Sequence, residues 1–78
     1  MEIFDRLKSI LVDDFDIDET LAKEDARIVT DLGMDSLEIA ELAITIEDVF
    51  EIEVQDEDMQ NDPTVGAIGS LIQSRKSS

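Results

Sequence analysis

The chain has 78 residues, with 21 Asp and Glu, 6 Lys and Arg, no His and no Cys, and its formal net charge is −15. This length fits a single domain, in which residues 74–78 form a short polar tail. The missing Cys and His exclude disulfides, zinc–thiolate sites and Cys nucleophiles, and they remove the usual general base and transition-metal ligand. The negative charge disfavours nucleic acid and anionic membranes as partners, and it favours basic proteins or cations.

The N-terminal sequence lacks the basic region and the apolar core of a secretory signal peptide. No apolar run approaches the roughly 20 residues that are needed to span a bilayer. We therefore expect a cytoplasmic protein that does not insert into membranes. The high net charge favours a monomer.

Apolar residues at helical spacing predict a first helix from about Glu2 to Phe15. Residues 16–34 follow with weak periodicity, and a connection of this length is unusual in so small a domain. It closes on Gly33, which suits a tight turn with unusual dihedral angles. We expect the scattered apolar residues of the connection to anchor it across the helices. These residues are Leu21, Ala26, Ile28, Val29 and Leu32.

The strongest helix signal runs from Asp35 to Glu51. Asp35 can serve as the N-cap, with Glu38 as its capping-box partner. Met34 and Ile39 then occupy the two positions of a hydrophobic staple, which fixes the entry of the chain into the helix.

The C-terminal part of the sequence predicts two further helices. Residues 52–54 are apolar but short, and we interpret them as a connection and not a strand. Asp56 to Asn61 can form one or two turns capped by Asp56, and Thr64 is a plausible N-cap for the last helix. Gly66 and Gly69 each weaken that helix by about 1 kcal/mol relative to Ala. The predicted fold is all-α, a small bundle of three main helices and one short helix, with a long loop between the first and second helices.

The helix predicted at residues 35–51 carries two apolar stripes when its residues are placed about 100° apart around the axis. The stripe expected to face the core contains Ile39, Leu42, Ala43, Ile46, Val49 and Phe50. The second stripe, on another side and flanked by acidic residues, contains Leu37, Ala40 and Ile44. It either packs against the long loop or forms an exposed docking surface. The docking interpretation gains support because residues 28–74 contain twelve acidic residues and no Lys or Arg.

Ser36 lies in the first turn of this helix, where capping is the ordinary role of a Ser. A catalytic role is disfavoured, because no His can activate the hydroxyl and the sequence around it is not Gly-x-Ser-x-Gly. A modified Ser is more plausible, since a phosphate at this position would meet free N–H groups and the positive end of the helix dipole.

The segment Asp31-Leu32-Gly33-Met34-Asp35-Ser36-Leu37-Glu38, followed by Glu41-Leu42, resembles the signature of acyl carrier proteins. The resemblance covers nearly the whole chain and is closest to the free-standing carriers of bacterial-type fatty acid synthesis. It implies a carrier that is not an enzyme and that holds acyl groups as thioesters on a 4′-phosphopantetheine arm, attached to Ser36 from coenzyme A. The alternatives are a carrier for polyketide, D-alanyl or peptidyl chemistry, or an acidic interaction adaptor without a prosthetic group.

The resemblance also implies partners and their contact residues. The partners would be basic-surfaced enzymes: phosphopantetheinyl transferase, ketoacyl synthases, reductases and acyltransferases. The implied docking residues are Asp35, Leu37, Glu38, Ala40, Glu41, Ile44, Glu47 and Asp48. The implied lining of an acyl pocket is Ile28, Val29, Ile39, Ala43, Ile46, Ile68 and Leu71. Gly66 and Gly69 depart from the family pattern, and they either loosen the last helix or enlarge this pocket.

Asp14, Asp16 and Asp18 have the spacing of the first three ligands of an EF-hand loop. The sixth position of such a loop would be Glu19 instead of Gly, and the twelfth would be Asp25 instead of Glu. We therefore expect no dedicated metal site, and only weak cation binding that stabilises the fold.

Overall fold

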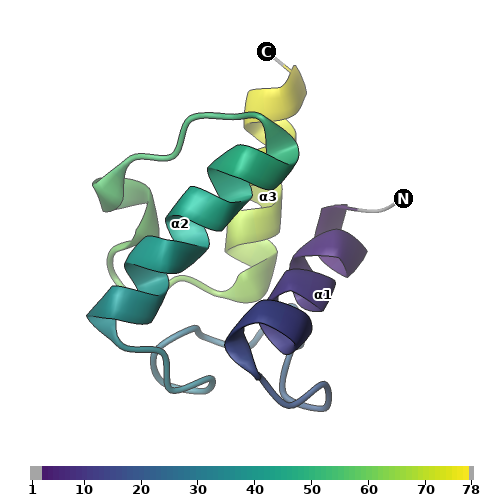
Figure 1. Ribbon diagram of the computed structural model, residues 1–78, viewed down its shortest axis with the longest axis vertical. Coiled ribbons are helices and arrows are strands. Elements are labelled where there is room, and N and C mark those ends of the chain that lie inside the picture. Colours follow the sequence, from purple (N-terminus) through teal and green to yellow (C-terminus); the bar gives the residue numbers. More distant parts are fainter. Residues whose placement is uncertain (1–2, 78) are drawn as a thin grey trace.

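The computed structural model describes residues 3–77, and within that range it contains helices and no strand (Figure 1). The elements are α1 (Ile3–Phe15), α2 (Ser36–Phe50), the 3-10 helix η1 (Asp56–Met59) and α3 (Val65–Ser77). The predicted all-α fold is confirmed, together with its long loop between the first two helices. The predicted first residue of α1, Glu2, lies outside the described residues.

The core forms where the apolar faces of the helices and the long loop meet. α1 packs against α3, and η1 packs against α2. The buried cluster contains Leu7, Ile10, Leu11, Ala26, Ile28, Met34, Leu42, Ile46, Phe50, Met59, Val65, Ile68 and Ile72. The predicted core stripe of α2 is confirmed, because its remaining members pack against this cluster as partly buried residues. These members are Ile39, Ala43 and Val49.

Both ends of α2 are closed by specific contacts. Asp35 Oδ1 accepts a hydrogen bond from the Glu38 N–H at 2.8 Å, and Glu38 Oε1 accepts one from the Asp35 N–H at 3.2 Å. The predicted capping box is therefore confirmed. The helix ends at Glu51, which has a left-handed backbone with φ of 56°. Lys76 of α3 donates from Nζ to the Phe50 carbonyl at 3.2 Å, which satisfies one of the free carbonyls at this end.

The long loop is anchored by fewer residues than the sequence predicted. Ala26 and Ile28 are buried, but Leu21 is 50% exposed and Val29 is 44% exposed. The anchoring prediction is therefore wrong for Leu21 and Val29. In each case the adjacent residue is buried, Ala22 beside Leu21 and Ile28 beside Val29. Leu21 and Val29 both lie in turns, where neighbouring side chains point in different directions, so burial of one leaves the other exposed.

The segment between α2 and α3 differs in one detail from the prediction. Asp56 is the first residue of η1 and not its cap, because the N-cap position belongs to Gln55. The stabilising side chain is that of Asp58, whose Oδ2 accepts a hydrogen bond from the Gln55 N–H at 2.7 Å. The predicted cap of α3 is confirmed, since Thr64 Oγ1 accepts from the Ala67 N–H at 3.0 Å.

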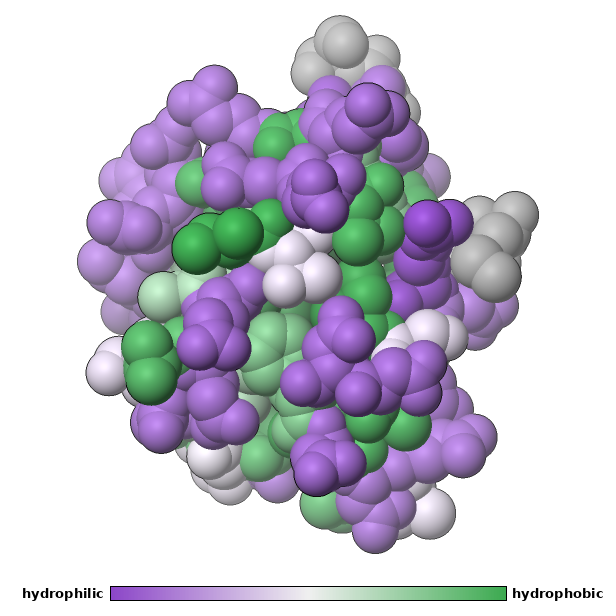
Figure 2. Space-filling view, in the orientation of Figure 1, coloured by the Kyte–Doolittle hydropathy of each residue, from purple (hydrophilic) through white to green (hydrophobic). Residues whose placement is uncertain are grey.

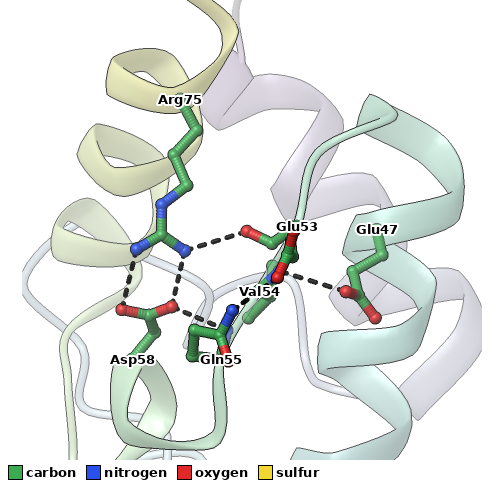
Figure 3. Close-up of polar contacts among 6 residues, drawn as sticks. All are labelled: Glu47, Glu53, Val54, Gln55, Asp58 and Arg75. Atoms are coloured by element: carbon green, nitrogen blue, oxygen red, sulfur yellow. Dashed lines mark hydrogen bonds and ion pairs between the residues drawn. The ribbon is translucent and has the colours of Figure 1, made fainter. Parts of the chain in front are cut away.

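Arg75, in the last turn of α3, binds residues of the segment between α2 and α3 (Figure 3). Its guanidinium binds the Asp58 carboxylate in a two-pronged pair, with Nη1 2.5 Å from Oδ2 and Nη2 3.1 Å from Oδ1. Nη1 also donates to the Glu53 carbonyl at 2.9 Å. The Arg75 hydrogen bond is the first cause that holds the pKa of Asp58 below its ordinary value, followed by the Gln55 N–H.

The two unusual glycines of α3 have different surroundings. The Gly66 N–H donates to the Glu24 carbonyl at 2.8 Å, and a Cβ at this position would lie 3.0 Å from the same oxygen. A Cβ at Gly69 would have no heavy atom within 4 Å. Gly66 therefore allows the loop to approach the start of α3 closely, a role that differs from both explanations suggested by the sequence.

Candidate functional site

Ser36 is the first residue of α2, and its side chain is exposed. Asp35 and Glu38 perform the capping, so the ordinary explanation for a Ser at this place does not apply. No hydrogen bond within residues 3–77 involves the Ser36 hydroxyl. The site thus presents an accessible hydroxyl beside the first N–H groups of a helix.

A short turn carries the chain from the core to this exposed hydroxyl. Met34 is buried in the core, and Gly33 has φ of 70° in the left-handed region, as its place in the sequence predicted. The Gly33 N–H donates to the Val29 carbonyl at 3.0 Å, and the Met34 N–H donates to the Ile28 carbonyl at 3.0 Å. These bonds close the turn, so the position of Ser36 depends on residues 28 and 29.

The second apolar stripe of α2 is exposed. Leu37 is 68% exposed, Ile44 is 64% exposed, and Ala40 is exposed as well. The alternative in which this stripe packs against the long loop is therefore wrong. Figure 2 shows the face of the molecule seen in Figure 1, where apolar areas lie among hydrophilic side chains.

The acidic docking candidates fall into two groups. Glu41 and Asp48 are exposed, and neither carboxylate takes part in a hydrogen bond within the described part of the chain. Asp35 and Glu38 are engaged in the capping box. Glu47 is partly buried, and its Oε2 accepts from the Val54 N–H at 3.1 Å (Figure 3). The structure therefore gives Glu47 an internal role that sequence spacing could not indicate.

Most of the pocket candidates belong to the core. Ile28, Ile46 and Ile68 are at most 2% exposed, and Ile39 and Ala43 pack against the same cluster. Leu71 is partly buried. Neither Leu71 nor Val29 belongs to this cluster, and Val29 is the more exposed of the two.

Asp62 is a polar residue that bonds to the loop before Ser36 and that the sequence did not single out. Its Oδ1 accepts from the Val29 N–H at 2.7 Å and from the Thr30 N–H at 3.3 Å. Its Oδ2 accepts from the Thr30 hydroxyl, and this bond is the first cause that lowers the pKa of Asp62. Its backbone carbonyl accepts from Arg27 Nη1 at 2.9 Å. These contacts join segments more than thirty residues apart, which no local pattern indicates.

The EF-hand-like carboxylates do not form a cation site. Within residues 3–77, no group of three or more carboxylates is close enough to hold a metal ion. Asp18 Oδ1 instead accepts from the Thr20 hydroxyl at 2.7 Å and from the Thr20 N–H at 2.9 Å. These two bonds, the hydroxyl first, lower the pKa of Asp18. None of the described helices has the length and apolar character of a membrane span.

Comparison with known proteins agrees with this arrangement. Residues 5–72 match a family model described as a phosphopantetheine attachment site. The chain is 37% identical over 76 residues to an acyl carrier protein of Wolinella succinogenes, covering 97% of this chain and 100% of that protein. A solved structure of the acyl carrier protein from Enterococcus faecalis is similar with a TM-score of 0.78 and 32% identity, covering 95% of this chain and 94% of that one. The chain therefore belongs to the acyl carrier protein family, whose members carry acyl groups on a covalently attached 4′-phosphopantetheine arm.

Proposed function

We propose that Ser36 is the residue that bears the 4′-phosphopantetheine arm. The observation that supports this most directly is the exposed Ser36 hydroxyl, which has no structural hydrogen bond to fulfil within the described chain. The neighbouring cap is provided by Asp35, so modification of Ser36 leaves the start of α2 intact.

The surroundings of Ser36 fit the phosphate end of this arm. A phosphate on the hydroxyl would lie beside the N-terminal N–H groups of α2 and the positive end of its dipole. The arm itself supplies the thiol that carries the cargo, and the chain has no Cys that could compete for it.

We propose fatty acid synthesis as the pathway. The support is the Asp31–Glu38 signature together with an α2 surface in which Glu41 and Asp48 are free and exposed. Carriers of polyketide, D-alanyl and peptidyl groups share the attachment chemistry, so the cargo has to be tested separately. Membership of the carrier family favours all of these over an adaptor without a prosthetic group.

The exposed face of α2 is our candidate for partner docking. Leu37, Ala40 and Ile44 supply an apolar strip, and the nearby Glu41 and Asp48 supply negative charge. A partner with a basic patch around an apolar contact would match this face. The transferase, ketoacyl synthases, reductases and acyltransferases would all use it, because each must reach the same arm at the start of α2. The chain presents the cargo to these enzymes and does not itself catalyse a reaction.

We propose that the acyl chain shelters among the core residues next to α2. Ile28, Ile46 and Ile68 pack in one cluster, with Ile39 and Ala43 at its edge. A chain bound there would take the place of contacts that these side chains make with one another, so that longer cargo requires more rearrangement. Val29 is too exposed to line this space and would contact only its entrance.

The attachment site is tested by intact mass measurement. The unmodified chain is incubated with coenzyme A, magnesium and a broad-specificity phosphopantetheinyl transferase, alongside a Ser36→Ala variant and a known carrier. We expect one phosphopantetheine to be added to the wild-type chain and none to the variant. An unmodified wild-type chain, in a reaction that modifies the known carrier, would contradict the assignment.

The pathway is tested on the modified chain. Reconstituted fatty acid synthesis enzymes and, in parallel, a D-alanine-activating enzyme are offered the same preparation, and the bound cargo is measured by mass. We expect the fatty acid synthesis enzymes to elongate and fully reduce the bound acyl chain, and we expect no loading of D-alanine. Loading of D-alanine without acyl elongation would contradict the fatty acid pathway and would identify the protein as a D-alanyl carrier.

A further inference from the structure

The segment that leads to Ser36 is held in place from a distant part of the chain. Residues 27–34 form neither a helix nor a strand. Within the described chain, the hydrogen bonds that leave this segment go to residues 62 and 63. Three of their acceptor atoms belong to Asp62, namely both carboxylate oxygens and the backbone carbonyl, and the fourth is the Pro63 carbonyl, 3.1 Å from the Ile28 nitrogen.

The contacts of Asp62 connect to Ser36 through a short series of bonds. Its carboxylate holds the N–H groups of Val29 and Thr30. The carbonyls of Ile28 and Val29 in turn accept the N–H groups of Met34 and Gly33, which directly precede Asp35 and Ser36. A movement of the turn at residues 28–30 would therefore move the start of α2.

The backbone at Asp62 is itself in an uncommon conformation. Asn61 has φ of 68° and Asp62 has φ of 52°, so two consecutive residues other than Gly occupy the left-handed region. Such conformations persist where surrounding contacts hold them. Here those contacts are the bonds of the Asp62 side chain and carbonyl to the loop.

We propose that Asp62 is a positioning residue for the modification of Ser36. It holds the turn at residues 28–30 in the conformation that presents Ser36 to the transferase. This inference rests on the proposed attachment at Ser36. Without the Asp62 carboxylate, the turn would be free to open, and the transferase would have to order it on binding. The cost of that ordering raises KM and leaves kcat largely unchanged.

The test compares transfer kinetics at a temperature well below the melting temperature of every variant. Asp62→Gly removes the carboxylate and accommodates the positive φ, and Asp62→Asn keeps an oxygen acceptor for the two N–H groups. We expect KM for the carrier to rise about tenfold in Asp62→Gly and less in Asp62→Asn. Asp58→Ala is the matched control, because it removes another hydrogen-bonded Asp, the one bound to Arg75, without touching the loop before Ser36.

A structural readout separates positioning from a general loss of stability. Amide hydrogen exchange at Val29, Thr30 and Gly33 should be faster in Asp62→Gly and unchanged in Asp58→Ala. If Asp62→Gly does not fold, Thr30→Val serves in its place. It alters an exposed side chain and removes only the hydroxyl bond to Asp62. Its KM should then rise about threefold, in keeping with the loss of a single hydrogen bond.

Two results would overturn the positioning role while leaving the attachment site intact. One is a wild-type KM in Asp62→Gly, or in Thr30→Val where that variant replaces it. The other is an equal rise of KM in Asp58→Ala, which would reduce the effect to stability. If the wild-type chain is not modified at all, the attachment at Ser36 and the role of Asp62 both fail.

Discussion

Gly66 and Gly69 lie one helical turn apart in α3, but they differ in what surrounds them. Gly69 has open space where a Cβ would be, so Gly69→Ala should gain the helix propensity of Ala, about 1 kcal/mol. In a chain of this size the gain corresponds to a rise of roughly 4–8 °C in melting temperature. Gly66→Ala should gain nothing or lose stability, since its Cβ would press on the Glu24 carbonyl. Thermal unfolding followed by circular dichroism measures both, and equal gains would contradict the close-approach role of Gly66.

The carboxylate of Asp58 makes stability depend on acid pH. Its pKa is lower in the folded chain than the ordinary value of 3.8, so the unfolded chain binds more protons in this range. The stabilisation is therefore present above that value and is lost as pH falls through the lower folded pKa. We expect melting temperature to fall with pH in this window, and to fall less steeply in Asp58→Asn.

Asp56→Asn provides the control for this pH profile. It removes a carboxylate from the same short helix, but the Asp56 side chain makes no hydrogen bond within the described residues. The melting temperature of Asp56→Asn should fall with pH as steeply as that of the wild type. If the melting temperature of Asp58→Asn fell with pH as steeply as that of the wild type, the ion pair between Asp58 and Arg75 would make no contribution to the pH dependence of stability.

Among the elements, α2 has one face in the core and another face that is exposed to solvent. Its buried residues Leu42, Ile46 and Phe50 repeat at helical spacing, while Leu37 and Ile44 stand exposed on another side. An exposed apolar side chain gains little from folding, so its value is expected in binding.

Ile44→Ser tests the docking face directly. The side chain is 64% exposed, so the melting temperature should change little. KM for the transferase should rise roughly five- to tenfold, the effect of losing one apolar anchor. Leu21→Ser is the control, since Leu21 is 50% exposed but lies on the long loop. Equal effects of both variants, or none in Ile44→Ser, would argue against docking through this face.

At the scale of the whole molecule, the net charge of −15 opposes the compact state. Millimolar magnesium or calcium at low ionic strength should therefore raise the melting temperature, as should sodium chloride at higher concentration. In about 1 M salt, where the screening length is about 3 Å, the added divalent cation should have little further effect. An unchanged melting temperature on adding either salt at low ionic strength would contradict this expectation.

The sequence predicted the features that depend on neighbouring residues. The Asp35–Glu38 capping box, the turn at Gly33 and the two stripes of α2 each involve residues within a few positions or one helical period. Hydrogen bonds at this range and the 3.6-residue period are encoded locally, and Ser36 could be located for the same reason. The two hydrogen bonds of the capping box explain why, within residues 3–77, the Ser36 hydroxyl makes no hydrogen bond.

The residues that hold the loops, and the loop side chains that enter the core, are determined by how the helices pack in three dimensions. Asp62 meets Val29, Arg75 meets Asp58 and Gly66 meets Glu24 across separations of seventeen to forty-two residues. Such pairs form because packing of the helices brings distant segments together, and the periodicity of the sequence does not indicate these contacts. Local pattern therefore determined the helices and the place of Ser36, while the packing of the bundle determined how firmly that place is held.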